Sequence, residues 1–460
     1  MRSLRAFLCA SIAGAALLSS CDQVGGQQGM QPNASQESDA APHATWLADF
    51  AAMQRLSELG GNAFEAEQFE DAAAFYARAS MFKDNVPGPT GQYLALFATA
   101  AYTKAGEPEK AVAMLKRSVD QGFRLADFAE NYPDLAPLKD RDAFKAQIAR
   151  ARENAANYDA SHRDPNTAKL IFDDVPRFWA AYDLAEKTDN KDAKAAIFRR
   201  EYLAPGTNGL IDYHFVKTQS MEKLVDKIEE SHGYYEGIRE RTLSAAQYEP
   251  VIREGLRSIV ALYPEASVPD VTFVIGRLNS GGTAGPTGML IGLDVWSWAE
   301  GIPLDGIPAG FQKVVTNLDL DALPFIVVHE HIHTLQQYGG EETLLLGALR
   351  EGSADFIAGL AMPEQEKPHY YRWGVEREAI IWKRFAGEMD GDNVADWIGN
   401  NGSMDEEGWY ADLGYFIGAR ICEDYYAQAE DKQQAIRDLL FVTDAKAILE
   451  ASGYAARFTE

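Results

Sequence analysis

His329-Glu330-His331-Ile332-His333 decides how the larger part of this chain is interpreted, because it holds three of the eight histidines and has the pattern H-E-x-x-H. In an α-helix of ~3.6 residues per turn, His329 and His333 lie about 40° apart, so their imidazoles converge on one point that suits a zinc ion, Zn²⁺. Glu330 lies ~100° round from His329, near enough to touch a water held by the metal. This placement predicts a general base. His331 points ~200° away and is left out of the ligand set.

The residues around this motif favour a helix. Asp321 is a candidate cap, Pro324 suits a first turn, and Gly339-Gly340 is expected to end the segment. The β-branched run 325–328 also suits a strand. The unbroken length from Ala322 to Tyr338 favours the helix.

A catalytic zinc site needs three protein ligands, and a second segment offers another. Glu351 and Asp355 stand one helical turn apart in a stretch otherwise rich in Leu, Ala and Phe, with Thr343 as its candidate cap. An ordinary solvated helix face is the alternative interpretation. Two carboxylates on a mostly apolar helix need a charge to face, which favours a place near the metal.

H-E-x-x-H followed by E-x-x-x-D on the next helix resembles the gluzincin metallopeptidases, the thermolysin-like zincins. This resemblance implies that Glu351 is the third zinc ligand and that Asp355 accepts a hydrogen bond from His329. A carboxylate in that position fixes the orientation of a metal-bound imidazole and raises its basicity. Arg350 stands where the thermolysin-like pattern has an asparagine beside the second histidine, so the resemblance names no group that orients His333.

A closer resemblance covers roughly residues 170–440. Four segments resemble a bacterial family of predicted Zn-dependent proteases: Arg177-Phe178-Trp179, Phe273-Val274-Ile275-Gly276, Ser280-Gly281-Gly282-Thr283 and Glu351-Gly352-Ser353-Ala354-Asp355-Phe356. By the zincin resemblance, residues 288–292 are expected to form the strand at the edge of the cleft, where an extended substrate pairs with it. The sequence also predicts a strand at 271–275 and a glycine-rich turn at 279–288.

Peptide hydrolysis builds negative charge on the carbonyl oxygen, so a donor is expected opposite the zinc. Tyr415 is the first candidate for this second catalytic role, and the alternatives are Tyr410, His369 and Arg420. The glycines of Gly414-Tyr415-Phe416-Ile417-Gly418 stand at i and i+4 and form a smooth stripe for close packing. Aromatic residues on helices more often belong to the core, and that alternative stays open for Tyr415.

The first 21 residues resemble a lipoprotein signal peptide. A short basic start precedes the apolar run 6–18, which is too short to span a bilayer, and Leu18-Ser19-Ser20-Cys21 resembles the bacterial lipobox. A lipid on Cys21 would anchor the exported protein in a membrane, facing the periplasm. A plain secretory signal is the alternative, and inner and outer membrane are not separated. Cys422 is then the one unlipidated cysteine of the mature chain, so no intramolecular disulfide forms.

Composition narrows the class of partner. With 46% hydrophobic residues the chain is globular, and its formal charge of −26 repels phosphate backbones, so no nucleic acid partner is expected. The expected partners are a peptide or protein substrate, the membrane through Cys21, and a protein bound by an N-terminal helical module.

That module covers residues 46–155. Gly60, the residues Ala72, Tyr76 and Ala79, and the later set Ala111, Leu115 and Ser118 resemble the packing positions of tetratricopeptide repeats. Generic helical hairpins are an equal alternative, because the spacing of 39 residues differs from the usual repeat of about 34.

The sequence thus predicts an α+β, predominantly helical protein in four parts. These are a signal peptide (1–21), a flexible tether (22–45), the tetratricopeptide-like helices (46–155) and a zincin-like metallopeptidase domain with a small sheet (165–460). The favoured function is zinc-dependent peptide hydrolysis by an envelope lipoprotein. One alternative is a lipoprotein scaffold whose helical repeats bind a partner and whose zinc site is vestigial or structural. Another is a zinc hydrolase that acts on a non-peptide amide.

Overall fold

The computed structural model describes residues 45–84, 86, 88, 90–399 and 409–458. The predicted signal peptide, most of the tether and Cys21 lie outside the described residues. Within them the chain is predominantly helical with one small mixed sheet, which confirms the α+β prediction. No helix of the described part is both long enough and apolar enough to cross a bilayer.

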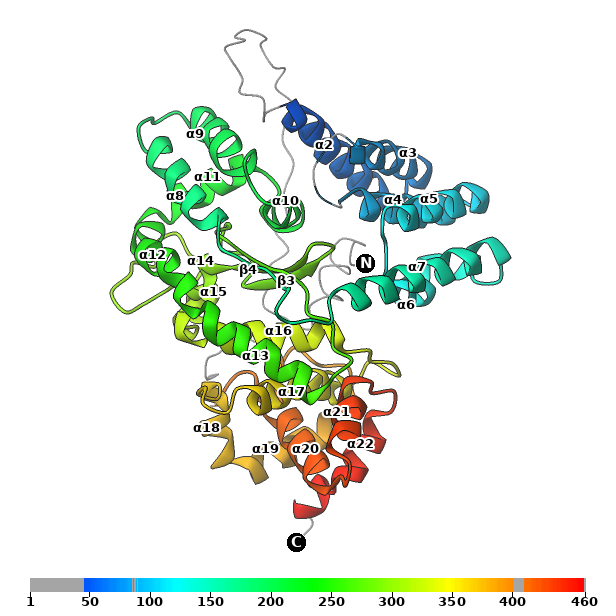
Figure 1. Ribbon diagram of the computed structural model, residues 1–460, viewed down its shortest axis with the longest axis vertical. Coiled ribbons are helices and arrows are strands. Elements are labelled where there is room, and N and C mark those ends of the chain that lie inside the picture. The colour runs from blue at the N-terminus through cyan, green and yellow to red at the C-terminus, as the bar shows by residue number, and fades with distance from the viewer. Residues whose placement is uncertain (1–44, 85, 87, 89, 400–408, 459–460) are drawn as a thin grey trace. The chain divides into compact units, whose positions relative to one another are not determined.

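The described elements follow one another as helices interrupted by four short strands (Figure 1). Those before the sheet's second strand are α2 (Thr45–Glu65), α3 (Phe69–Ala79), η1 (Ser80–Asp84), α4 (Thr90–Lys104), α5 (Pro108–Asp120), α6 (Ala126–Asn131), η2 (Pro133–Leu138), α7 (Asp142–Ser161), β1 (Leu170–Ile171), α8 (Asp174–Ala185), α9 (Lys191–Phe198), η3 (Arg199–Leu203), α10 (Asn208–Tyr213), η4 (His214–Thr218), α11 (Met221–Glu230), α12 (His232–Ser244), η5 (Ala245–Tyr248) and α13 (Glu249–Leu262). The remainder are β2 (Val271–Val274), β3 (Gly282–Gly285), β4 (Gly288–Gly292), α14 (Leu293–Trp296), α15 (Ala309–Asn317), η6 (Leu320–Ala322), α16 (Leu323–Leu335), α17 (Leu344–Ala361), α18 (His369–Val375), α19 (Glu378–Glu388), α20 (Leu413–Gln428), α21 (Lys432–Leu440), α22 (Ala445–Ser452) and η7 (Tyr454–Phe458).

The described chain divides into two compact units. Unit 1 contains residues 45–156 and 177–225, and unit 2 contains residues 157–176 and 226–458. The predicted domain bounds of 46–155 and 165–460 stay a prediction, because grouping by contacts does not test which segments fold independently.

Unit 1 packs its first helices through small residues. A Cβ added to Gly60 on α2 would lie 2.9 Å from the ring of Tyr76 on α3, so only glycine allows this approach. Ala72, Ala111 and Leu115 are fully buried, and the Ser118 hydroxyl donates to the Gln92 carbonyl at 2.8 Å. The positions predicted to pack do pack, while their assignment to tetratricopeptide repeats stays a prediction.

The sheet of unit 2 has the strand order β1-β2-β4-β3. β4 pairs in parallel with β2 and antiparallel with β3, so it is an interior strand. Residues 288–292 form a strand as predicted, but both of its sides are paired, so it cannot be the strand that pairs with an extended substrate. The two edge strands are β1 and β3, and β3 lies within the segment predicted to be only a glycine-rich turn. The predicted strand at 271–275 is confirmed as β2.

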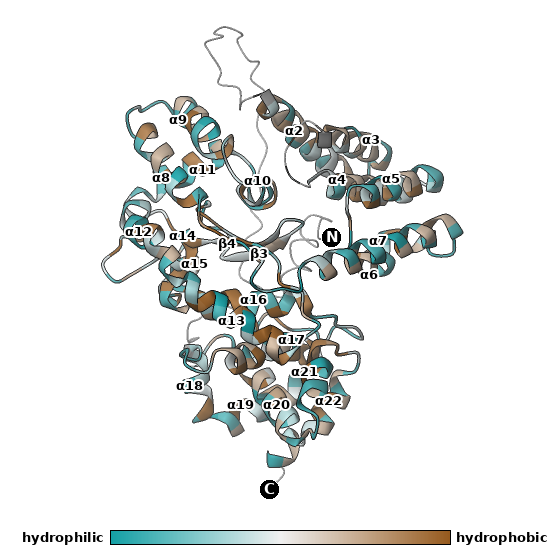
Figure 2. Ribbon diagram, in the orientation of Figure 1, coloured by the Kyte–Doolittle hydropathy of each residue, from teal (hydrophilic) through white to brown (hydrophobic). Residues whose placement is uncertain are grey.

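Beyond the sheet, unit 2 is built from helices that bury continuous apolar surface. α13 and α17 both pack on α16, and hydrophobic colouring is extensive on α16 and α17 (Figure 2). The closest crossing joins α17 to α20, where a Cβ on Gly418 would lie 1.8 Å from the carbonyl oxygen of Ala348. A Cβ on Gly352 would lie 2.1 Å from Gly418. The predicted close packing of the 414–418 stripe is confirmed.

Helix α16 starts one residue inside its predicted bounds and ends three residues earlier than predicted. Pro324 lies in the first turn as expected, but Asp321 belongs to the preceding η6, which Asp319 caps. The helix stops at Leu335, and Gln336 is extended with φ −71° and ψ 137°. Residues 336–339 instead run beside the segment in which α21 ends. The amides of Gln337 and Gly339 donate to the carbonyls of Leu440 and Val442.

Candidate metal centre

Two neighbouring helices bring the predicted ligands together. α16 carries His329 and His333 one turn apart, and α17, whose N-terminus is capped by Thr343 as predicted, carries Glu351. The Nε2 atoms of the two imidazoles lie 3.0 Å apart, and the Glu351 Oε2 lies 3.2 Å from that of His333 and 3.7 Å from that of His329. Among the described residues this is the one cluster of three His, Cys, Asp or Glu side chains whose ligand atoms all lie within 4.8 Å of one another.

Asp355 orients His329. The imidazole Nδ1 of His329 donates to Asp355 Oδ1 at 2.8 Å, one turn further along α17 from Glu351. The other oxygen of Asp355 accepts a hydrogen bond from the Tyr370 hydroxyl on α18. The carboxylate therefore links the metal helix, α17 and α18 in one buried chain of hydrogen bonds.

Gln336 orients His333, a role that the sequence left without a candidate. The Gln336 amide nitrogen donates to the Arg350 carbonyl at 2.7 Å and to the Ser353 hydroxyl at 2.8 Å. Because a carbonyl only accepts, the amide oxygen of Gln336 must face His333, and it lies 2.7 Å from Nδ1. Arg350 itself points to Glu342, and only its backbone carbonyl serves this network.

These partners determine where the imidazole protons lie. Both Nδ1 atoms face oxygens that accept, so each Nδ1 carries a proton and each Nε2 directs a lone pair into the cluster. Glu351 Oε2 is buried there and accepts no hydrogen bond from any described residue. Two nitrogen lone pairs and a carboxylate oxygen at 3.0–3.7 Å require a cation among them, either a proton or a metal ion.

The donor set fits zinc. Zn²⁺ binds imidazole nitrogen and carboxylate oxygen at roughly 2.0–2.2 Å, which in a tetrahedron places the donor atoms about 3.3 Å apart. The three observed separations bracket this value. His329, His333 and Glu351 would hold the ion, and Asp355 and Gln336 supply the second layer of hydrogen bonds that zinc ligands usually have.

The pKa values of the cluster reflect the same convergence of acceptors. Burial lowers the pKa of His329, but the hydrogen bond to Asp355 and the nearby carboxylate of Glu351 outweigh burial and raise it to about 10. Burial raises the pKa of Glu351, but the two histidines outweigh it and lower that pKa to about 2. Without metal, the cluster therefore holds a proton on His329 beside an ionised Glu351 across neutral pH.

The remaining predicted residues surround the triad. Glu330 is buried outside the ligand cluster, toward β3, because a Cβ on Gly282 would lie 3.1 Å from its Oε1. The ring of Tyr415 stacks on His329 at a centroid distance of 6.2 Å. His331 points away, as predicted, and its Nε2 donates to the Ser267 carbonyl at 2.7 Å.

Two of the alternatives to Tyr415, Arg420 and Tyr410, make their contacts away from the cluster. Arg420 pairs with Glu378 and Glu423, and Tyr410 packs against Trp373. The side chain of His369 lies outside the described residues.

Comparison with known proteins gives one family. The family model described as "Gliding motility protein GldB" matches residues 180–456, more than half of the chain. No curated protein matches the chain, and no solved structure matches it.

This match corrects the sequence analysis. The matched region contains the whole H-E-x-x-H and E-x-x-x-D pattern, yet its family is described by gliding motility and not by proteolysis. The predicted membership of a gluzincin-type protease family is wrong, and so is the assignment as a zinc metallopeptidase. The match tests the class of protein and not single residues, so the roles predicted for Glu330 and Tyr415 and the zinc ligands remain untested predictions.

Proposed function

Because this chain belongs to the GldB family of gliding motility proteins, we propose that it works as an envelope lipoprotein scaffold that binds a protein partner in a motility complex. The observation that carries this proposal is the family match over residues 180–456. The lipobox-like Cys21 supports attachment to a membrane, and the N-terminal helices offer a surface for a protein partner.

We further propose that His329, His333 and Glu351 bind Zn²⁺ and that the ion is structural. Three observations support this role: the lone pairs converge, the cluster is buried, and Asp355 and Gln336 tie the ligands to α17 and α18. A metal held this way would add a direct link between α16 and α17, which already meet through apolar packing and through the hydrogen bond of His329 to Asp355. The zincin-like arrangement of residues 165–460 belongs to the same proposal and rests on the order of β4, α16 and α17.

Gliding of cells that carry single variants in place of the normal protein tests the scaffold. Glu351→Gln removes a metal ligand and should abolish gliding, since the centre that holds α16 and α17 together is lost. Glu330→Gln is the matched control, because it makes the same chemical change at a residue outside the ligand cluster. It should leave gliding intact.

Loss of gliding in Glu330→Gln, with zinc still bound, would contradict a purely structural centre. Gentle detergent extracts provide the second measurement. The protein should migrate as an assembly larger than its own mass, and migration as a free monomer in gliding cells would contradict the scaffold.

A further inference from the structure

The corner between α18 and α19 exposes apolar side chains. Among the described residues of unit 2, Ile380 is 63% exposed and Val375 is 51% exposed, more than any other large hydrophobic side chain. Isolated exposed hydrophobics are common, but these two flank a single turn between helices. We define the corner face by these residues and their aromatic and basic neighbours, which are Trp373, Val375, Arg377, Ile380, Arg384, Trp409 and Tyr410.

Aromatic rings and arginines form the body of the corner face. The guanidinium of Arg377 lies 4.6 Å from the ring centroid of Trp373, and that of Arg384 lies 4.9 Å from Trp409. The Trp373 ring also lies 6.4 Å from Trp409 and 5.8 Å from Tyr410. These contacts hold the rings of Trp373 and Trp409 against the two arginines.

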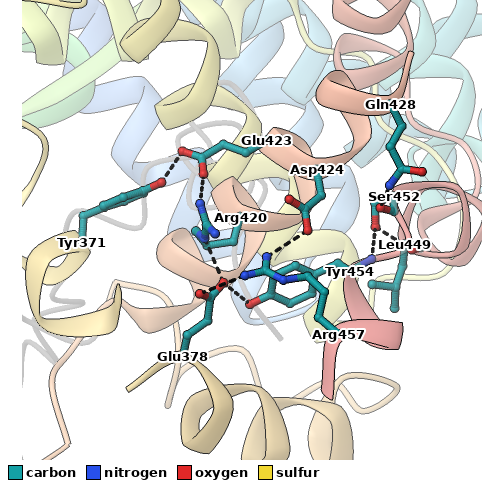
Figure 3. A network of polar contacts seen from close by, with 10 residues as sticks. All are labelled: Tyr371, Glu378, Arg420, Glu423, Asp424, Gln428, Leu449, Ser452, Tyr454 and Arg457. Carbon is teal, nitrogen blue, oxygen red and sulfur yellow. Dashed lines mark hydrogen bonds and ion pairs between the residues drawn. The ribbon is translucent and has the colours of Figure 1, made fainter. Parts of the chain in front are cut away.

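A network of polar contacts on the inner side fixes how α19 is rotated (Figure 3). Glu378 accepts from Arg420 at 2.8 Å and from the Tyr454 hydroxyl at 3.0 Å, and it also pairs with Arg457. Its side chain is only 13% exposed. With Glu378 held inward, Ile380 is held outward, so its exposure is a fixed property of the packed helices.

Charge distinguishes this surface from the chain as a whole. The segment 369–388 contains four Lys or Arg and three Asp or Glu, so its formal net charge is +1. One of the three acidic residues is Glu378, which points inward. The whole chain, by contrast, carries a net charge of −26. Arg377 and Arg384 pair with Glu376 and Glu388 at 3.2 Å, and such exposed pairs stabilise little, so the arginines remain available to other anions. Three acidic residues at 405–407 precede Trp409 but lie outside the described residues.

We propose that the corner face contacts the surface of the lipid bilayer, with Ile380 and Val375 inserted at the headgroup boundary. Trp and Tyr with basic neighbours around aliphatic residues is the composition of membrane-interface contacts. The choice of this occupant rests on the lipid attachment in the proposed function, because with Cys21 in the bilayer the 23 residues from 22 to 44 can span at most roughly 80 Å. A tether of this length raises the effective concentration of the whole chain at the bilayer, so a weak contact suffices.

Spin labels on the full lipidated protein test the contact. Ile380→Cys carries the probe at the corner face, and Val251→Cys on α13, native exposure 38%, is the matched control at an exposed aliphatic site elsewhere in unit 2. Cys422 is fully buried, and burial raises the pKa of its thiol, so it does not take the label. The vesicles contain phosphatidylethanolamine and a minority of phosphatidylglycerol, and no other protein.

The measured quantity is the ratio of collision rates with oxygen, which concentrates in the bilayer, and with a water-soluble nickel chelate. At position 380 this ratio should rise several-fold when the protein is transferred from a mild detergent onto the vesicles, and at position 251 it should stay unchanged. An unchanged ratio at both positions would overturn the proposal and leave a protein partner as the occupant. An equal rise at both positions would overturn it as well, because that would be unspecific adsorption.

Discussion

At the scale of single residues, the metal centre depends on how each imidazole is held. Gln336 uses both ends of its amide, since its oxygen accepts from His333 and its nitrogen donates to Arg350 and Ser353. Removing the amide would free the His333 ring to rotate and would remove the group that fixes its tautomer.

We therefore expect Gln336→Leu to weaken zinc binding roughly 10- to 100-fold, the usual effect of losing an outer partner of a metal ligand. Competition with a chromogenic chelator measures this affinity. Gln337→Leu makes the same change at an exposed neighbour and should bind zinc as the unaltered protein does. Equal affinities in the two variants would remove Gln336 from the centre.

Helical periodicity pairs His329 with His333 and Glu351 with Asp355, and the resemblance to gluzincins related one pair to the other. Gln336 could not be predicted in this way, because it lies beyond the end of α16, where the chain is extended and follows α21. The one hint in the sequence was that Arg350 stands where the thermolysin-like pattern has an asparagine, so that another residue had to orient His333. Tyr370 was missed for a similar reason, because it reaches Asp355 from a separate helix.

At the scale of elements, the crossing of α17 and α20 carries the centre's geometry. Gly418 touches the backbone of α17 near Ala348 and Gly352, and Glu351 lies between those two residues in sequence. Close packing of the two backbones also brings Tyr415 onto His329. Any added side chain at this crossing must push the helices apart.

We expect Gly418→Ala to lower the free energy of unfolding by about 3 kcal/mol, near the upper range for overpacked cores, because the new Cβ would meet the Ala348 carbonyl. Gly359→Ala on α17 is the control. Nothing lies within 4 Å of its added Cβ, so it should be neutral or stabilise by up to about 1 kcal/mol. Denaturant unfolding measures both, and equal midpoints would contradict the role of this crossing.

The spacing of Gly414 and Gly418 predicted the close packing of α20, which the structure confirms. The sequence did not predict the edge strand β3. β3 contains two glycines, a threonine and an alanine, so it has no alternating pattern that would mark a strand. Its pairing with β4 is determined by the rest of unit 2, and local preference alone favours a turn. The resemblance to zincins then assigned the substrate-pairing role to β4, which is paired on both sides.

At the scale of the whole molecule, the same histidine motif is compatible with a catalytic zinc site and with a structural one. The spacing of the motif determines where the candidate ligands lie, whereas catalysis also depends on the rest of the protein. The match to a gliding motility family over residues 180–456 decides against peptide hydrolysis. We propose in its place a lipoprotein scaffold whose unit 2 is held together by zinc.

Thermal unfolding of the purified protein with and without a strong chelator tests this account most directly. An ion that binds the folded state stabilises it by about 3 kcal/mol when present at 100 times its dissociation constant, so chelation should lower the midpoint by several degrees and zinc should restore it. Glu351→Gln should start at the lower midpoint and respond to neither reagent. Identical midpoints for the unaltered protein in chelator and in zinc would contradict a structural metal.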